Sequence, residues 1–336
     1  MIDEAGHPSI LNSVAYCWTE AKQAVLQCRG SNHLDSFQSI TKRSTASRGR
    51  LARLPLEILN KILFELDVES LGSIRLLNTW FKDVVDSLPA YRALAIYATH
   101  ALRALTVTNM LSQHSVGHLY DTLTKSRCTT CSMSLGPFLF IPTGRRYCYC
   151  CIKTHPHMQM LTYTSAKKLF RLSKKALKQI AIIATVPGTY GLSRKPHKRR
   201  TRIVSVDAAT QLAIMIYSRD VAESIIMDWY CTRHPDPNNT LRFMACTPFP
   251  YLDAQQHRSQ KLVYCHGCEY DWYTSSEDYS PGYSPMDLFI KQGSSFTEDK
   301  FLAHYEECGS AKMLYKEYIL KGRRLEESVT GRIFRT

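Results

Sequence analysis

Residues 54–94 carry three short helical patterns in direct succession, and these patterns restrict the region to helices that pack on one another. Apolar side chains recur at spacings of three and four, which gives each helix one apolar face. Pro55 suits the start of the first helix, because proline has no N–H to leave unbonded there. Asp67 and Ser70 predict the end of the first helix and the start of the second, and Asn78 or Thr79 predicts the start of the third.

A region this small cannot enclose so many large apolar side chains by itself. Each one left in water costs roughly 1.5 to 3 kcal/mol relative to full burial. Two interpretations remain: the three helices belong to the core of a larger domain, or they present an apolar surface to a partner protein.

The same region resembles the F-box over about forty residues. The resemblance rests on Leu54-Pro55, Glu57-Ile58-Leu59, Ile62-Leu63, Leu71, Leu76, Asn78, Trp80, Val84-Val85 and Leu88. It implies three helices that dock on a Skp-type adaptor, which links the protein to a cullin ubiquitin ligase. The adaptor contacts that it implies are those of Leu54, Pro55, Ile58, Leu59, Leu63 and Trp80.

Twelve cysteines and the absence of long apolar runs bear on the compartment. The N-terminus shows no apolar signal region, and no stretch approaches eighteen apolar residues. We therefore expect an intracellular protein of the nucleus or cytoplasm, or both, with no membrane partner. Most cysteines come in close pairs, which in such a compartment favours metal ligation over disulfide bonds.

The first cysteine group pairs Cys128 and Cys131 with Cys148 and Cys151. Two C-x-x-C pairs suit tetrahedral zinc, and the residues between them are numerous enough to form a β-hairpin. Cys150 can replace either neighbour, although the spacing favours Cys148 and Cys151. A RING-type ligase needs a second interleaved ligand set close by, and this sequence has none.

The second group is spread more widely and comprises Cys265, Cys268, His304 and Cys308. His304 and Cys308 are four residues apart on a predicted helix, so both side chains point from one face. We expect two structural zinc ions in all. Both proposed sites have four protein ligands and no open position, which indicates structural rather than catalytic metal.

Basic charge is concentrated in one segment. Residues 122–206 contain no Asp or Glu and seventeen Lys and Arg, more than the whole net charge of +14. The densest run contains Arg194, Lys195, Lys198, Arg199, Arg200 and Arg202. It predicts a nuclear-localisation signal, a contact for nucleic acid or an acidic protein, or simply a solvated loop.

The resulting expectation is a mainly α protein: a three-helix F-box followed by a mostly helical body with small zinc-stabilised β-hairpin elements. The expected units are a flexible arm (1–48), the F-box (49–94), connecting helices (95–125), a basic segment with the first cluster (126–206), a C-terminal body with the second (207–320) and a tail (321–336). Over residues 50–318, TGRRYCYCC, VPGTYG, YCHGCE and FLAHYEEC make the chain similar to fungal F-box proteins with cysteine-rich bodies.

The leading functional hypothesis is a non-catalytic adaptor that holds a Skp-type protein through the F-box and an unknown client through the cysteine-rich body. The alternative is a nucleic-acid-binding zinc protein that uses residues 122–206. An enzyme is the weakest hypothesis, because the sequence lacks H-E-x-x-H, G-x-S-x-G and G-x-x-x-x-G-K motifs.

Overall fold

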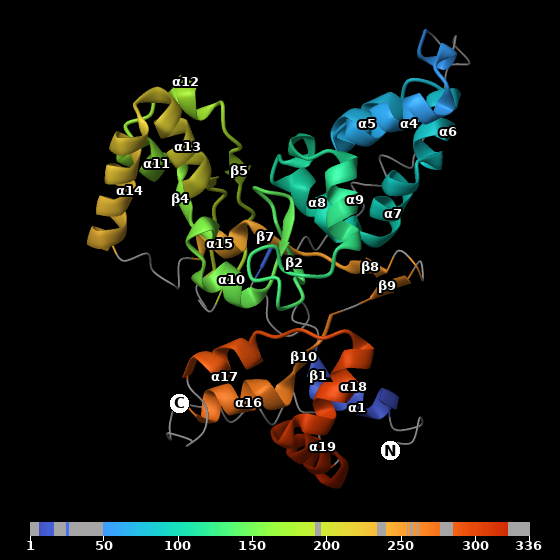
Figure 1. The fold of residues 1–336 in the computed structure, drawn as a ribbon, viewed down its shortest axis with the longest axis vertical. Helices are drawn as coiled ribbons and strands as arrows, with labels where there is room; N and C mark the ends of the chain where they lie inside the picture. Colours follow the sequence, from blue (N-terminus) through green and yellow to red (C-terminus); the bar gives the residue numbers. More distant parts are fainter. Residues whose placement is uncertain are drawn as a thin grey trace.

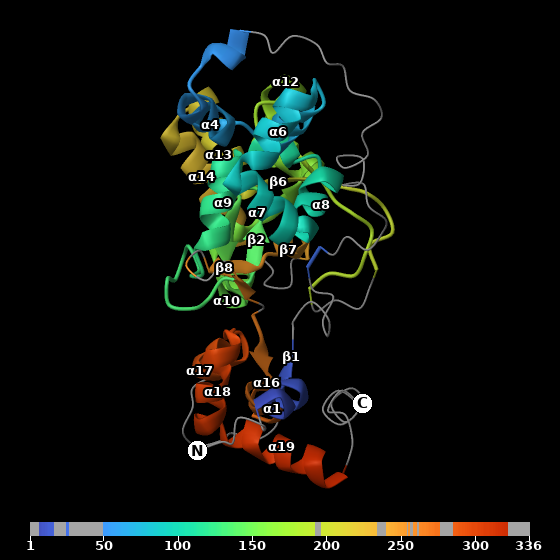
Figure 2. The same ribbon diagram turned by 90° about the vertical axis from the view of Figure 1, so that its right-hand side faces the viewer.

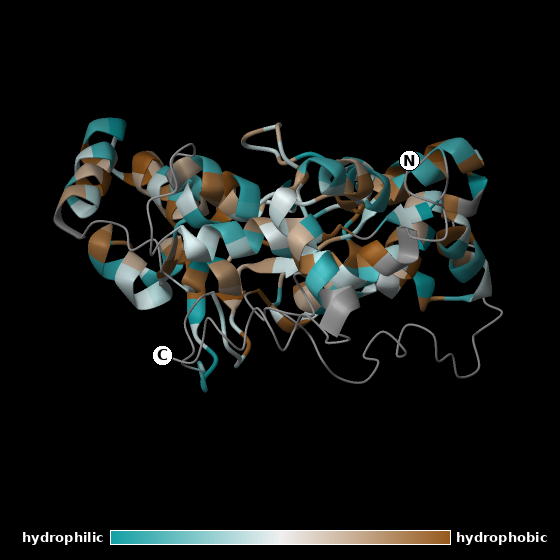
Figure 3. Cartoon of the chain, turned by 90° about the horizontal axis from the view of Figure 1, so that it is seen from below, coloured by the Kyte–Doolittle hydropathy of each residue, from teal (hydrophilic) through white to brown (hydrophobic). Residues whose placement is uncertain are grey.

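The computed structural model describes residues 7–16, 25–26, 50–191, 196–233, 240–253, 255, 258–260, 262–275 and 285–321. Helices dominate these residues, and the strands form small antiparallel sheets, so the predicted mainly α fold is confirmed. Figure 1 shows three regions: the early helices at the upper right, a mixed region at the upper left and centre, and a C-terminal lobe below. Hydrophobic and hydrophilic residues are interspersed along the helices (Figure 3).

The first region opens with three helices where the sequence predicts them. They are α4 (Leu56–Glu65), α5 (Val68–Arg75) and α6 (Thr79–Ser87), preceded by a 3-10 turn, η2 (Arg50–Arg53). The Asp67 side chain caps α5 by accepting from the Ser70 N–H at 2.8 Å. Asn78, rather than Thr79, caps α6 by accepting from the Phe81 N–H at 2.9 Å. The predicted helix starts are therefore confirmed.

Three further helices connect this region to the central sheet. They are α7 (Pro89–Tyr97), α8 (Thr99–Val107) and α9 (Val116–Thr124), with η3 (Leu111–Gln113) between the last two. Ser115 caps α9 by accepting a hydrogen bond from the His118 N–H at 3.2 Å. Helix α9 packs against α4 and α7, so it joins the first three helices to the rest of the chain.

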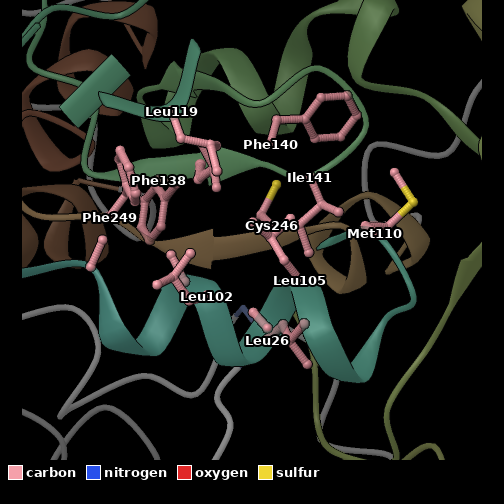
Figure 4. Close-up of a cluster of buried hydrophobic side chains, with 14 of the residues drawn as sticks. Leu26, Leu102, Leu105, Met110, Leu119, Phe138, Phe140, Ile141, Cys246 and Phe249 are labelled. Atoms are coloured by element: carbon pink, nitrogen blue, oxygen red, sulfur yellow. The ribbon is translucent and has the colours of Figure 1, made fainter. Parts of the chain in front are cut away.

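The central sheet has the order β3-β2-β7 and lies against α8 and α9. Its strands are β2 (Phe138–Phe140), β3 (Arg145–Tyr147) and β7 (Cys246–Pro248). The predicted hairpin is present as β2 and β3, with Phe138 opposite Tyr147. In Figure 4, Leu102 and Leu105 of α8 face Phe138 of β2 and Cys246 of β7 across this core. Strand β7 lies more than a hundred residues after β2 in the chain, so local sequence patterns do not predict that the two strands pair.

A second core lies in the mixed region. The elements of the mixed region are α10 (Tyr149–Thr154), η4 (Pro156–Met158), β4 (Met160–Thr162), α11 (Tyr163–Leu169), α12 (Lys174–Leu177), β5 (Ile183–Ala184), β6 (Arg202–Ser205), α13 (Val206–Ile216), α14 (Arg219–Arg233) and α15 (Leu241–Met244). Residues of β4, β6 and α11 to α14 form the second core, whereas α10 and α15 pack into the central one. The strands of this region form a sheet of order β4-β6-β5. Phe170 and Leu212 are among the fully buried side chains of the second core.

The predicted basic run divides between described and undescribed residues. Arg194 and Lys195 lie outside the described residues. Lys198, Arg199 and Arg200 are exposed, and Arg202, the first residue of β6, places its guanidinium carbon 4.3 Å from the centre of the Tyr163 ring.

The C-terminal lobe combines both ends of the described chain (Figure 2). Its elements are α1 (His7–Val14), β1 (Ala15–Tyr16), β10 (Tyr264–Cys265), α16 (His266–Thr274), α17 (Pro285–Gln292), α18 (Glu298–Glu307) and α19 (Gly309–Lys321). A hairpin of β8 (Tyr251–Asp253) and β9 (Arg258–Gln260) precedes β10 in the chain. Residues 7–16 thus differ from the expectation of a flexible arm: Ile10 and Val14 are buried, and β1 pairs with β10. Their partners are more than two hundred residues away, so local pattern does not show them.

Helix α1 should therefore be required for the stability of the C-terminal lobe. Val14 is fully enclosed in a core formed with α18 and α19, so Val14→Asp buries a charge there and should cost about 3 kcal/mol or more. Hydrogen exchange should speed up in α16 and α19 and stay unchanged in α8. Val221→Asp, at an exposed position, is the control. Unchanged exchange in α16 and α19 would show that α1 contributes nothing to the lobe.

None of the described helices has both the length and the apolar character needed to span a membrane.

Candidate metal centres and an exposed apolar helix surface

The four cysteines of the first predicted group converge in the structure. The sulfur atoms of Cys128, Cys131, Cys148 and Cys151 lie within 4.8 Å of one another. Two of them, Cys131 Sγ and Cys148 Sγ, are 3.9 Å apart. A tetrahedral zinc ion with Zn–S bonds of about 2.3 Å requires sulfur–sulfur distances of about 3.8 Å, whereas a disulfide requires about 2.05 Å. The group therefore fits zinc and not a disulfide.

Local folding explains how the two cysteine pairs meet. Cys128 and Cys131 lie in a turn after α9, and Cys148 is the N-cap residue of α10. The β2–β3 hairpin reverses the chain between them, with Gly144 at φ +62° in its turn. The Thr129 N–H donates to the Arg146 carbonyl at 2.8 Å, which joins the first cysteine turn to β3.

Cys150 lies outside this group of four. Its thiol points toward α17, 3.6 Å from the Phe289 carbonyl oxygen, and close to Gly293. Burial raises the pKa of Cys150 to about 12, so it remains a neutral thiol at physiological pH. Cys150 lies on α10, packs against α17 of the C-terminal lobe, and is not positioned as a ligand.

Crowding of the four sulfur atoms splits their protonation. Thiol hydrogen bonds from Cys148 and Cys151 lower the pKa of Cys128. The hydrogen bonds shared with Cys128 and Cys151 raise the pKa of Cys148. One buried thiolate, that of Cys128, therefore accepts hydrogen bonds from neighbouring thiols that keep their protons. A divalent cation at the same point would replace those protons.

The second group also converges, despite its wide spacing in the sequence. Cys265, Cys268, His304 and Cys308 bring their ligand atoms within 4.8 Å of one another. Cys265 Sγ lies 3.9 Å from Cys308 Sγ, and Cys268 Sγ lies 3.3 Å from His304 Nε2. Three sulfurs and one imidazole nitrogen match a structural zinc ligand set.

Neighbouring side chains orient the second group. The His304 ring stacks on Phe296 with centroids 4.4 Å apart, which fixes the direction of its Nε2 atom. His266, between the paired cysteines, lies outside the group and places Nδ1 3.5 Å from a Glu269 carboxylate oxygen. Cys265 and Cys268 lie at the start of α16, His304 lies on α18, and Cys308 is the C-cap residue of α18, so the site connects two helices.

A buried arginine adjoins the first group and was not anticipated from the sequence. Arg146 is almost fully enclosed, and burial lowers its pKa to about 9. Its guanidinium donates to the carbonyls of Thr122, Gly136, Phe249 and Pro250. These carbonyls belong to α9, the loop before β2, and the segment between β7 and β8. Arg146 is therefore a cross-link, and the density of basic residues in the sequence gave no sign of its burial.

Replacing this arginine should destabilise the fold strongly. Arg146→Met keeps the aliphatic stem but leaves four carbonyl oxygens without their donor, at about 1 to 3 kcal/mol for each buried unsatisfied group. Removing the charge recovers part of its desolvation cost, so we expect a net loss of about 3 kcal/mol or more. The measurement is urea unfolding, with Arg145→Met at the exposed neighbouring position as control. Equal unfolding midpoints for both variants would be incompatible with a cross-linking role.

The six predicted adaptor contacts divide into exposed and enclosed side chains. Leu54, Pro55 and Ile58 are exposed, and Trp80 is half-buried with its ring against Phe81. Leu59 and Leu63, by contrast, are 1% and 2% exposed and face the chain's own core. In this structure, their side chains secure α4 to the rest of the fold and are not available to a partner.

Several exposed leucines extend the apolar surface of α4 beyond the predicted positions. Among the described residues, seventeen large apolar side chains are exposed, and seven of them fall in residues 51–77. These seven, which we call the apolar docking residues, are Leu51, Leu54, Leu56, Ile58, Ile62, Leu76 and Leu77. Figure 1 places their helices at the upper tip of the molecule, far from the C-terminal lobe.

Comparison with known proteins identifies one part of the chain. Residues 51–93 match the F-box domain, so the three helices α4, α5 and α6 are an F-box. No curated protein and no solved structure matches the chain.

Proposed function

We propose that this protein is the substrate-recognition subunit of a Skp-cullin-F-box ubiquitin ligase. The F-box binds a Skp-type adaptor, which connects the chain to a cullin, and the cysteine-rich body binds a client protein. The observation that carries this proposal is the concentration of exposed apolar side chains in residues 51–77 of the F-box, on α4 and in the segments that flank α4 and α5.

The apolar docking residues are costly to leave in water. Leu77 is 61% exposed and Leu56 is 53% exposed. Full burial of each such side chain stabilises a complex by roughly 1.5 to 3 kcal/mol, so a surface of seven leucines and isoleucines favours a protein partner. Both interpretations of the three helices therefore have support: they contribute Leu59 and Leu63 to the core, and the F-box also carries exposed apolar side chains.

The body is suited to holding a client rather than to catalysis. Each metal centre offers four protein ligands, as structural zinc sites do, so we infer that zinc stabilises the body. A zinc ion in such a site supplies cross-linking of distant segments and no reactive water. Ubiquitin transfer then belongs to the partners that the F-box recruits, in the nucleus or the cytoplasm.

Co-purification with a Skp-type adaptor tests the proposal. The wild-type chain should capture the adaptor, and Leu54→Ala/Pro55→Ala should capture much less, because both side chains are exposed at the start of α4. Zinc content and circular dichroism should be equal in the two proteins. Failure of the folded wild type to capture any adaptor would reject the proposal.

Nucleic acid remains the second candidate partner, because residues 198–200 and 202 present exposed cations close together. Steeply salt-dependent binding to DNA or RNA, unchanged by the Leu54→Ala/Pro55→Ala exchange, would favour it.

A further inference from the structure

A hollow of about 660 Å³ opens beside the first metal centre. It lies between the end of α9, the first cysteine turn and β3. Its charged lining residues are Asp121, Lys125, Arg127, Arg145 and Arg146. Pockets of this size hold a drug-sized ligand or several residues of a peptide.

Positive charge dominates the rim of this hollow. Lys125, Arg127 and Arg145 are exposed, and they come from three successive parts of the fold. Asp121 is the one acidic residue among the described residues that line it. The Arg146 guanidinium is engaged with carbonyls, as described above, and closes one wall of the hollow.

Hydroxyl groups and a fixed guanidinium add hydrogen-bond donors. Five hydroxyl side chains line the hollow. Those of Thr122 and Thr124 donate to backbone carbonyls, which leaves Ser126, Thr129 and Ser132 as the hydroxyl donors for a ligand. One terminal nitrogen of Arg127 donates to the carbonyls of Ser132 and Met133 at 3.2 and 3.0 Å, which holds this side chain against the cysteine turn. A guanidinium carries five N–H donors, so these bonds leave most of its capacity for an anion.

We propose that this hollow receives a phosphorylated serine or threonine side chain of the client protein. The inference rests on the proposed function, because it assigns the client site of the same adaptor. A phosphate ester carries close to two negative charges and three acceptor oxygens, which match several cations and hydroxyl donors better than a single carboxylate does. The remaining volume accommodates the residues that flank the phosphorylated one.

One feature favours a peptide over nucleic acid in the hollow. No Phe, Tyr or Trp is among the described residues that line it, so stacking on bases has no platform. The adjacent metal centre, which includes Cys128, fixes the cysteine turn, so the site is organised before the ligand arrives.

The test is retention of a peptide library by the immobilised full-length, zinc-loaded chain. The library has a central phosphoserine or phosphothreonine with random flanking residues, and the matched library has the unmodified residue. Wild type should retain the phosphorylated peptides at least about tenfold better, and Arg127→Ala/Arg145→Ala should lose this preference. Lys174→Ala/Lys175→Ala removes the same charge from exposed positions of α12 and should keep it.

Two results would overturn the proposal: equal retention of both libraries by the wild type, or an equal loss of preference in the α12 control. Retention of a random single-stranded DNA oligomer that depends on Arg127 and Arg145, without preference for phosphopeptides, would assign the hollow to nucleic acid instead. Capture of the Skp-type adaptor should be the same for all three proteins. Failure of the client-site proposal is thereby distinguishable from failure of the adaptor role.

Discussion

Purified protein should carry two zinc ions per chain, and a chelator that withdraws both should unfold the body. Structural zinc contributes about 10 to 16 kcal/mol in small peptides, whereas a whole domain is stable by about 5 to 15 kcal/mol. Both centres lie inside apolar cores, since Cys128 and Cys148 belong to the central core and Cys265 and Cys308 to that of the C-terminal lobe. Loss of both ions should therefore remove as much free energy as stabilises the folded body, so the body should unfold.

Cysteine variants separate the two centres. Cys128→Ser should remove one ion and Cys265→Ser the other, each leaving one ion per chain by elemental analysis. Cys150→Ser is the matched control, because Cys150 lies in the same region but outside the group of four, and it should retain both ions. Circular dichroism during chelation reports the unfolding. A metal-free preparation with an unchanged spectrum would contradict the assignment of both centres.

Aspartate at two of the apolar docking residues should abolish adaptor binding without unfolding the chain. Ile58 and Leu77 are 44% and 61% exposed, so the free protein tolerates a polar side chain at both positions. In the complex, each exchange removes an apolar contact and buries a charge, at about 2 kcal/mol or more per side chain. Ile58→Asp/Leu77→Asp should therefore weaken binding by at least about a thousandfold.

The control for this variant uses an equivalent exchange elsewhere on the surface. Met215 and Met227 are 73% and 60% exposed on α13 and α14, outside the F-box. Met215→Asp/Met227→Asp adds the same charge to the chain and should leave the adaptor affinity within about twofold. Equal weakening by both variants, measured by titration of purified components, would show that net charge rather than the F-box surface determines binding.

Local sequence patterns predicted the features whose partners are close in the chain. The helix starts at Asp67 and Asn78 follow from side chains that cap a helix three residues ahead. The β2–β3 hairpin and the first cysteine group follow from short spacings and turn residues. The second group was also predictable despite the long gap between its halves. The C-x-x-C motif brings two of the ligands close together, and the His-x3-Cys spacing does the same for the other two.

Long-range contacts account for what the sequence did not show. Residues 7–16 were expected to be flexible, because nothing in their pattern identifies β10 and α19 as their partners. Leu59 and Leu63 carry the residue types of an interface, but they are buried in the core where α4 packs against α9. Arg146 reads as one more cation of a basic segment, yet four backbone carbonyls from distant segments enclose it. The hollow beside it exists only once these segments meet.

Calorimetric titration of the zinc-loaded, full-length chain with a purified Skp-type adaptor tests the adaptor role most directly. We expect a one-to-one complex that then binds a cullin, with a negative heat-capacity change from burial of the apolar docking residues. Absence of binding by a chain shown to be folded and to hold both zinc ions would contradict the adaptor role. The F-box helices would then serve only as core, and the basic surface of the body would be the place to look for a partner.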